Sequence, residues 1–264
     1  MERKRRAPVA AVKILLSTAI CLAAAITACG RADDTPSLRV EVIATRPHDT
    51  QAFTEGLEID GDTLYESTGL SGQSFVRATT LDSGIEFARA DLPAPLFGEG
   101  VTKAGEQLWQ LTYKDGIAIA RDPKSLAELH RSRFDGEGWG LCTRGDRILM
   151  SNGTGTLTFR DPHTFAPTGT VTLTSHENTE LNELDCAPDG SVYANAWPTD
   201  TILHIDPETG TVLHTIDASA LYPRDSRIPG ADVLNGITAI PGTDHFLLTG
   251  KKWPATYEVR FIPA

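Results

Sequence analysis

Basic residues are scarce in this chain of 264 residues. It has 24 Lys and Arg against 35 Asp and Glu, which gives a formal charge of −11. The first 28 positions hold five of the basic residues and only one acidic residue, so the rest of the chain carries −15. Binding to nucleic acid needs clustered basic side chains that neutralise phosphates. So acidic a protein offers no such patch, and nucleic acid is excluded as a partner.

Several signatures of catalysis are missing as well. The sequence contains no G-x-S-x-G nucleophile elbow and no phosphate-binding loop, and GLSGQS at 69–74 is typical of a turn. Its seven histidines follow no metal-ligand spacing. No window shows the apolar period of an amphipathic helix. These absences favour an all-β protein whose chemistry rests on oxygen-bearing side chains.

The N-terminus has the composition of an export signal. MERKRR is a basic segment, and VAAVKILLSTAICLAAAI is an apolar segment interrupted only by Lys13. This apolar run is too short and ends too abruptly to be a stable transmembrane span. Residues 26–29, ITAC, resemble a bacterial lipobox, in which the cysteine becomes the lipidated first residue. An ordinary cleaved signal with an incidental Cys29 is the alternative.

We therefore expect a lipoprotein-type signal peptide at 1–28, a linker at 29–37 and one domain at 38–264. The protein would be exported to the cell envelope or periplasm, held at the membrane only through a lipid on Cys29, and monomeric. Beyond Cys29 the sequence has only Cys142 and Cys186. An exported protein can keep a disulfide, so these two could pair or remain separate buried thiols, because sequence alone does not give their geometry.

A repeated unit runs through the rest of the chain. Each copy has a short strand, a tight Gly/Asp turn and a β-rich second strand. Further strands such as GIAIARD and TVLHTIDA follow. The five copies begin EGLEIDGDTLYESTG (55–69), EGVTKAGEQLWQLTY (99–113), WGLCTRGDRILMSNG (139–153), NELDCAPDGSVYANAW (182–197) and NGITAIPGTDHFLLTGK (235–251).

A repeat of about forty residues with four strands indicates a β-propeller, in which each blade packs against its neighbours. We predict five blades. The fifth repeat ends after TYEVRFI, one strand short, whereas LRVEVIATRP at 38–47 alternates cleanly before the first repeat. We expect this N-terminal strand to complete the last blade and close the ring. A β-sandwich is the alternative, but five repeats in register favour the propeller.

Two sets of aligned positions are candidates for a binding site. Equivalent positions in a propeller form a ring around its axis, and a purely structural ring would repeat one residue type. These rings instead mix carboxylates, amides, aromatic rings and an ammonium, as a small-molecule pocket does. The first strands begin at Glu55, Glu99, Trp139, Asn182 and Asn235, and the second strands end at Gly69, Tyr113, Gly153, Trp197 and Lys251.

Glu55 and Glu99 are the candidate proton carriers of this set. A carboxyl group near Trp surfaces tends to have a raised pKa, which suits general acid–base work. Glu55 is a secondary candidate, because it could simply bond backbone amides at the start of its strand. Asn182 and Asn235 can donate or accept hydrogen bonds.

The motifs QAFTEGLEI, GEGVT with LTY, GWGL, LNELD with YANAW, and VLNGIT with LTGKKWP resemble the plant-type glutaminyl cyclases. These are five-bladed propeller glutaminyl-peptide cyclotransferases, found also in bacteria. The match runs in order from about residue 44 to residue 262. It implies an enzyme that converts the N-terminal glutamine of peptides or proteins to pyroglutamate with release of ammonia.

The resemblance also implies roles for individual residues. Glu99 corresponds to the catalytic glutamate of the family. Tyr113 stands where the family usually has Trp, which keeps an aromatic wall but bears on substrate preference. The pocket residues of the family correspond to Gln51, Phe53, Trp139, Asn182, Trp197 and Lys251.

The chemistry suits these residues independently. The α-amine must attack its own γ-carboxamide, and with a pKa of about 7.7–8.0 part of it is already neutral at pH 7. An aromatic cage enforces the folded conformer, and one glutamate can carry a proton from the amine to the departing ammonia. Asn182, Gln51 or Lys251 could stabilise the oxyanion. This scheme requires no metal and no other cofactor.

Two other functions remain open at this point. Glu and Asn oxygens around a central ring would suit a calcium-dependent, lactonase-like propeller, although Lys251 and the Trp-rich wall weigh against a cation. A non-catalytic propeller that scaffolds an envelope complex is the second alternative.

Overall fold

The computed structural model describes residue 1 and residues 35–264. Residues 35–264 form one compact unit with twenty strands and a single 3₁₀ turn, η1 (Arg224–Ser226). The predicted all-β fold is confirmed for this part of the chain. The expected signal peptide and Cys29 lie outside the described residues. No helix of the described residues is long and apolar enough to cross a membrane.

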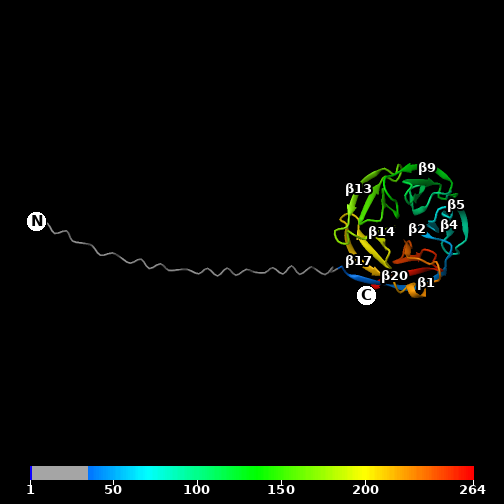
Figure 1. Cartoon of the computed structure of the whole chain (residues 1–264). Helices are drawn as coiled ribbons and strands as arrows, with labels where there is room; N and C mark the ends of the chain where they lie inside the picture. The colour runs from blue at the N-terminus through cyan, green and yellow to red at the C-terminus, as the bar shows by residue number, and fades with distance from the viewer. Residues whose placement is uncertain (2–34) are drawn as a thin grey trace. The chain divides into compact units, whose positions relative to one another are not determined.

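The first three repeats each form an antiparallel sheet of four strands in chain order. Figure 1 shows these sheets arranged one after another around a common centre. The first sheet consists of β2 (Thr54–Asp60), β3 (Thr63–Thr68), β4 (Phe75–Thr80) and β5 (Glu86–Asp91). The second consists of β6 (Gly98–Ala104), β7 (Gln107–Thr112), β8 (Ile117–Arg121) and β9 (Glu128–Arg133). The third consists of β10 (Leu141–Arg144), β11 (Arg147–Met150), β12 (Thr156–Arg160) and β13 (Pro167–Thr172).

The last two repeats share one eight-stranded sheet, in the order β14-β15-β16-β17-β1-β20-β19-β18. Strand β1 joins the two halves. The fourth repeat supplies β14 (Glu180–Cys186), β15 (Val192–Trp197), β16 (Thr201–Asp206) and β17 (Thr211–Asp217). The fifth supplies β18 (Leu234–Ala239), β19 (His245–Gly250) and β20 (Ala255–Pro263), and β1 spans Ser37–Pro47.

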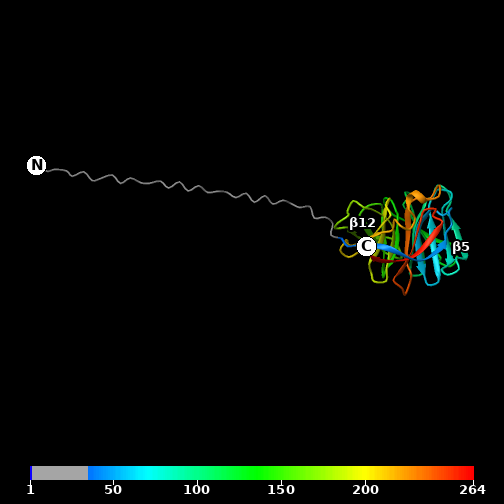
Figure 2. The ribbon, with the colours of Figure 1, turned by 90° about the horizontal axis from the view of Figure 1, so that it is seen from below.

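The N-terminal strand β1 starts one residue before the expected 38–47. It pairs antiparallel with β20 from Leu38↔Pro263 to Pro47↔Ala255, with an irregularity between Val42 and Ala44. It also runs parallel to the end of β17 over three residues. The strand that begins the described chain is therefore the hydrogen-bonded partner of the strand that ends it (Figure 2).

The first strand of each repeat lies nearest the centre. Strand β2 contacts β6 and β18, β10 contacts β6 and β14, and β14 contacts β18. Glycine permits the close approach: a Cβ on Gly56 would lie 2.7 Å from the backbone nitrogen of Val101. This explains why Gly so often follows the first residue of the repeat.

The fourth repeat places Glu183 where the others have glycine. Its side chain is fully buried, and its carboxylate accepts hydrogen bonds from the backbone N–H groups of Leu57 (3.1 Å) and Ile237 (2.7 Å). Burial raises the pKa of this carboxyl well above its ordinary value. Glu183 on β14 thus links three first strands, because its two oxygens bond the backbone of β2 and of β18.

Apolar side chains fill the spaces between neighbouring sheets. Between the second and third sheets, the rings of Trp109 and Phe165 pack with their centroids 4.9 Å apart, in a cluster that includes Leu141. The Trp109 indole N–H donates to the Pro162 carbonyl. Large fully buried aromatic side chains contribute much of the free energy of such a core. The result is a rigid support for the loops and strand ends at the centre.

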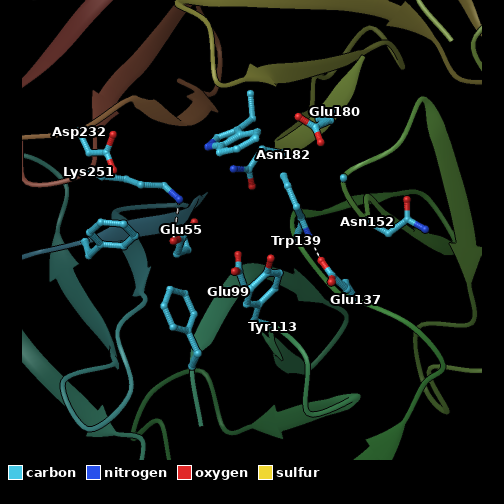
Figure 3. A pocket seen from close by; sticks show the side chains of 14 residues that line it. Glu55, Glu99, Tyr113, Glu137, Trp139, Asn152, Glu180, Asn182, Asp232 and Lys251 are labelled. Carbon is cyan, nitrogen blue, oxygen red and sulfur yellow. Dashed lines mark hydrogen bonds and ion pairs between the residues drawn. The ribbon is translucent and has the colours of Figure 1, made fainter. Parts of the chain in front are cut away.

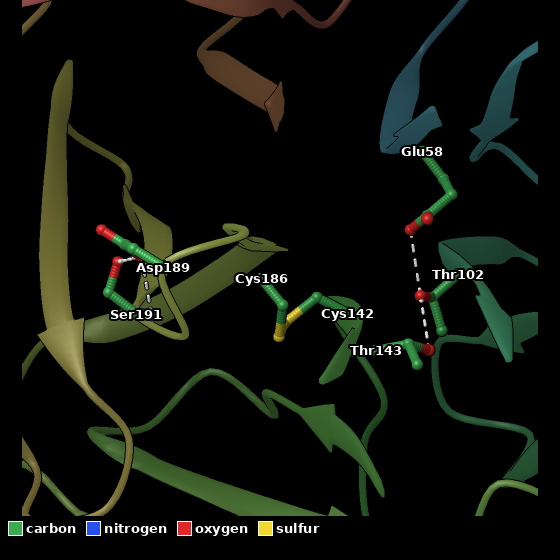
Figure 4. Close-up of a disulfide and its surroundings, with 7 residues drawn as sticks. All are labelled: Glu58, Thr102, Cys142, Thr143, Cys186, Asp189 and Ser191. Carbon is green, nitrogen blue, oxygen red and sulfur yellow. Dashed lines mark hydrogen bonds between the residues drawn. A yellow bond between two sulfur atoms is a disulfide. The ribbon is translucent and has the colours of Figure 1, made fainter. Parts of the chain in front are cut away.

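Cys142 and Cys186 are joined by a disulfide (Figure 4). The sulfur atoms are 2.03 Å apart, and the bridge links β10 of the third sheet to β14 of the next. Of the two arrangements left open by the sequence, the structure has the paired one.

Candidate active site

A cavity of about 440 Å³ opens where the first strands of the repeats begin (Figure 3). Residues from all five repeats meet there, although they lie far apart in the sequence. Eight of the predicted site residues line it: Phe53, Glu55, Glu99, Tyr113, Trp139, Asn182, Trp197 and Lys251.

Two predicted site residues lie elsewhere. Gln51 is exposed in a short turn and does not line the cavity, so its binding role stays a prediction. Asn235 is fully buried behind Glu55, and its Nδ2 donates to Glu55 Oε2 and to the Thr54 carbonyl, both at 3.0 Å. Asn235 therefore holds Glu55 in place.

Glu55 and Lys251 form a buried ion pair in which Nζ lies 2.7 Å from Oε1 (Figure 3). The carboxylate is 1% exposed and the lysine side chain 9%. Burial raises the pKa of Glu55, while the ammonium of Lys251 and its hydrogen bond oppose that rise. The pKa of Glu55 remains raised overall, but less than that of Glu99, because Lys251 bonds one of its oxygens and Asn235 the other. Glu55 is therefore the more readily ionised of the two glutamates.

Glu99 is in a different electrostatic position. It is 5% exposed, and its Oε2 is buried without a hydrogen-bond partner. Burial raises the pKa of this carboxyl well above its usual range, and the negative charge of Glu55 raises it further, against a smaller opposing effect of Lys251. Glu99 therefore keeps its proton where an ordinary glutamate has lost it. Asn182 Oδ1 is also buried and unpartnered in the same cavity.

Glycines on both sides of Glu99 fix its backbone. A Cβ on Gly98 would lie 2.5 Å from the carbonyl oxygen of Thr68, and one on Gly100 would lie 2.6 Å from the backbone nitrogen of Leu141. Both distances are too short for any side chain. The two glycines of the FGEG motif are thus needed because the first residues of β6 lie directly against the backbone of neighbouring strands.

A second layer of hydrogen bonds supports Glu55 and Lys251. The carboxylate of Glu66 accepts from Thr54, next to Glu55, at 2.7 Å and from His48 at 2.9 Å. The other ring nitrogen of His48 lies 2.8 Å from the carbonyl of Trp253, two residues after Lys251. Burial lowers the pKa of His48, but Glu66 more than offsets it, and the pKa is raised. The carboxylate of Glu66 therefore supports Glu55 through the neighbouring Thr54, and it supports Lys251 through His48 and the nearby backbone carbonyl of Trp253.

Aromatic rings form a continuous arc around the cavity. Neighbouring centroids lie 5.7–6.2 Å apart, mostly edge to face, which is the favoured geometry of aromatic pairs. Two glycines make room: a Cβ on Gly153 would lie 2.5 Å from the Trp139 ring, and one on Gly69 would overlap Phe97. The arc runs through Phe53, Phe97, Tyr113, Trp139 and Trp197.

The sequence analysis missed five lining residues. Phe97 could have been found, because it directly precedes GEG in the second repeat. The other four lie outside the two aligned rings, so the repeat gave no signal for them. They are Glu137, Asn152, Glu180 and Asp232. The acceptor of the Trp139 indole N–H is Glu137, at 3.0 Å.

Metal ligands are not gathered in the described part of the chain. Within residues 35–264, no three side chains of His, Cys, Asp or Glu are grouped so that they could hold a metal ion. The cavity itself presents an ammonium, Lys251, within a set of carboxyl and amide oxygens.

Comparison with known proteins identifies the family. The family model for glutamine cyclotransferase matches residues 14–261. The chain belongs to the glutamine cyclotransferase family.

Two relatives extend this result. A glutaminyl-peptide cyclotransferase of Arabidopsis thaliana is 37% identical over 231 residues, which cover 85% of this chain and 72% of the relative. The crystal structure of Myxococcus xanthus glutaminyl cyclase superposes with a TM-score of 0.79 at 37% identity, over 88% of this chain and all of that one. The resemblance that the motifs indicated is confirmed, as is a fold of the glutaminyl cyclase type.

Proposed function

We propose that this member of the glutamine cyclotransferase family converts the N-terminal glutamine of peptides and proteins to pyroglutamate and ammonia. The observation that carries the proposal is a carboxyl group with a raised pKa and an unpartnered oxygen, Glu99, inside an aromatic cavity. The names of both relatives refer to the same reaction.

The reaction forms one C–N bond and breaks another. The neutral α-amine attacks the γ-carboxamide carbon, its nitrogen becomes positively charged, and the carbonyl oxygen becomes an oxyanion. When the intermediate collapses, the carbonyl re-forms and the carboxamide nitrogen leaves as ammonia. That nitrogen must gain a proton and the attacking nitrogen must lose one, so the process needs a proton carrier and no net acid or base.

Glu99 suits this role. A protonated Glu99 can give its proton to the leaving nitrogen and recover one from the attacking nitrogen. Glu55 is the less suitable carrier, because both of its oxygens are held, one by Lys251 and one by Asn235. As a fixed negative charge, it supplies the repulsion that keeps the proton on Glu99.

The remaining lining residues position the substrate. The arc from Phe53 to Trp197 encloses the folded glutamine side chain, which converts an unfavourable conformer into the bound one. Asn182 places a buried amide with an unpartnered Oδ1 across the cavity from Glu99, where it can bond the carboxamide. Lys251 contributes positive charge near the developing oxyanion. No step requires a metal ion.

We also propose that the fold is a five-bladed propeller whose ring is closed by β1. The eight-stranded sheet divides naturally at β1 into two blades, β14 to β17 and β18 to β20 with β1 as the outer strand. Together with the three four-stranded sheets this makes five blades, closed by the pairing of β1 with β20. The five neighbouring first strands support it. We also propose that the protein acts as a monomer.

The activity is tested by incubating the mature protein with the dipeptide amide Gln-Ala-NH₂. Mass spectrometry of the peptide then detects the loss of ammonia. We expect cyclisation, and we expect it to persist after exhaustive chelation with EDTA, with circular dichroism as the control for folding. Activity that is abolished with the fold intact and restored by a divalent cation would favour the calcium-dependent alternative. A folded protein with no turnover would favour the scaffold alternative.

Export and lipid attachment at Cys29 are proposed on the N-terminal sequence alone. The supporting features are the basic segment, the apolar segment and ITAC. Replacing Cys29 with Ser should turn a protein that sediments with membranes into a soluble periplasmic or secreted one. A wild-type protein that is already soluble, with a mature N-terminus other than Cys29, would contradict the lipobox interpretation.

A further inference from the structure

The cavity carries more negative charge than the proposed reaction uses. One ammonium lies among its lining residues, and it is paired with Glu55. The carboxylate of Glu137 lies 3.3 Å from Lys114 Nζ outside the cavity. The lining carboxyl groups are those of Glu55, Glu99, Glu137, Glu180 and Asp232. After these pairings, Glu180 and Asp232 are left without a compensating cation.

Glu180 and Asp232 are both exposed at the cavity. Within residues 35–264, neither side chain has an ion-pair or hydrogen-bond partner. Glu180 opens β14 directly opposite Trp197 in the β14–β15 pair, and the Asp232 N–H donates to the Lys251 carbonyl at 2.9 Å. Figure 3 shows the two carboxylates with Asn182 between them. Glu180 lies on the same strand as Asn182, and Asp232 lies in the loop directly before β18.

The buried end of the cavity shows which part of a ligand it takes. Glu99 Oε2 and Asn182 Oδ1 are buried polar atoms without partners, and both residues are at least nine-tenths buried. Such atoms carry a desolvation cost until a ligand bonds them. They are where the N-terminal glutamine belongs, so the rest of the peptide must leave by the open side, past Glu180 and Asp232.

We propose, on the basis of the proposed cyclotransferase activity, that Glu180 and Asp232 select peptides with Lys or Arg directly after the N-terminal glutamine. The ammonium or guanidinium of that side chain is attracted to these carboxylates at the mouth and pairs with one of them, and an acidic side chain is repelled by them. The substrate class is therefore peptides with a basic segment behind the glutamine.

The size of the effect follows from the exposure of these carboxylates. An exposed ion pair changes an equilibrium constant by a factor of about 1.5–5, and a Glu side chain loses what a Lys side chain gains. We expect kcat/KM for Gln-Lys-NH₂ to exceed that for Gln-Glu-NH₂ about tenfold, with Gln-Ala-NH₂ between them. Because the screening length falls from about 10 Å at 0.1 M salt to about 3 Å at 1 M, the ratio should shrink at high salt.

The test measures kcat/KM for these three amides, together with their affinity from the fluorescence of the lining tryptophans. It compares wild type with the double variant Glu180→Gln/Asp232→Asn. Glu106→Gln is the matched control, because it removes an exposed charge at the turn between β6 and β7, outside the cavity. A Lys-over-Glu preference that falls to about unity in the double variant and survives in the control supports the proposal.

Equal kcat/KM values for the three amides in the wild type, or a preference that survives the double substitution, would overturn the proposal and leave the cyclotransferase function standing. If none of the amides is cyclised but the affinities show the charge preference, the function fails and the selectivity stands. Absence of both would refute both.

Discussion

Glu99 is a buried carboxyl group beside a second, ionised carboxyl group, Glu55. One ionised carboxylate disfavours ionisation of its neighbour, and burial acts in the same direction on Glu99. The Glu55–Lys251 pair therefore has an electrostatic function in addition to any structural one. This separation of roles between two glutamates depends on a lysine 196 residues from Glu55 in the sequence.

Replacement of Glu99 by Gln should lower kcat by about 10²–10⁴-fold. Gln keeps the size and the hydrogen-bonding capacity of the side chain but cannot carry a proton. KM should change little, because the aromatic arc and Asn182 hold the substrate. Steady-state kinetics on Gln-Ala-NH₂, with melting temperatures alongside, check this. A variant with wild-type kcat would remove Glu99 from the mechanism.

Replacement of Glu55 by Gln should chiefly affect stability, by about 3–5 kcal/mol, because it leaves the buried ammonium of Lys251 unpaired. The further change Lys251→Met removes that charge and should recover part of the loss. Denaturant unfolding of the two variants and of Lys251→Met alone measures the coupling. Purely additive free energies would show that the ion pair has no energetic coupling.

At the scale of elements, strand ends and turns carry the site while the sheets support it. Glu55 and Glu99 lie at the starts of β2 and β6, and Tyr113 and Lys251 directly follow β7 and β19. Side chains at strand ends can extend beyond the sheet into the cavity, while the hydrogen-bonded strand holds their backbone in place. The hydrogen bonds of His48 and Thr54 to Glu66 extend that support to the turn after β19.

The disulfide links two elements that belong to different sheets, β10 and β14. It closes a segment with a sequence separation of 44, so it restricts the unfolded chain substantially. The double variant Cys142→Ala/Cys186→Ala should lose about 2–5 kcal/mol of unfolding free energy while keeping its activity at 25 °C. Guanidinium unfolding checks this, with wild type under reducing agent as the control. Unchanged stability would mean that the bridge contributes nothing.

At the scale of the whole molecule, buried carboxyl groups at the centre govern the response to pH. Burial raises the pKa of Glu58 to about 8, and the charge of Asp185 adds to that rise. Burial raises the pKa of Asp185 to about 7. A group with a raised pKa in the folded state stabilises that state fully below its unfolded pKa, and the stabilisation is lost as pH rises through the folded value.

We therefore expect the free energy of unfolding to fall by a few kcal/mol between about pH 4.5 and pH 8. Glu66 acts in the opposite direction: burial raises its pKa, but His48 and Arg77 lower it to about 2, so its stabilisation is lost only in strong acid. Denaturant unfolding at several pH values measures the slope, and Glu58→Gln/Asp185→Asn should flatten it. A slope equal to that of wild type in this variant would contradict the assignment.

The repeat made much of the fold predictable. Alternating apolar residues and Gly/Asp turns determine strands locally, and five copies in register predict that equivalent residues meet around one centre. The all-β class and the convergence of Glu99, Asn182, Trp197 and Lys251 followed from this alone. The sequence could predict them because a repeat relates distant positions without knowledge of the path between them.

Tertiary structure decided what the repeat does not encode. Glu180 and Asp232 lie outside the aligned positions, and only packing brings them to the cavity. Whether Cys142 and Cys186 pair depends on the distance between two strands. The pKa of Glu99 is raised more than that of Glu55 because Lys251 and Asn235 hydrogen-bond to Glu55 and not to Glu99. Composition and periodicity are local properties, whereas charge balance and pairing depend on distances between residues remote in sequence.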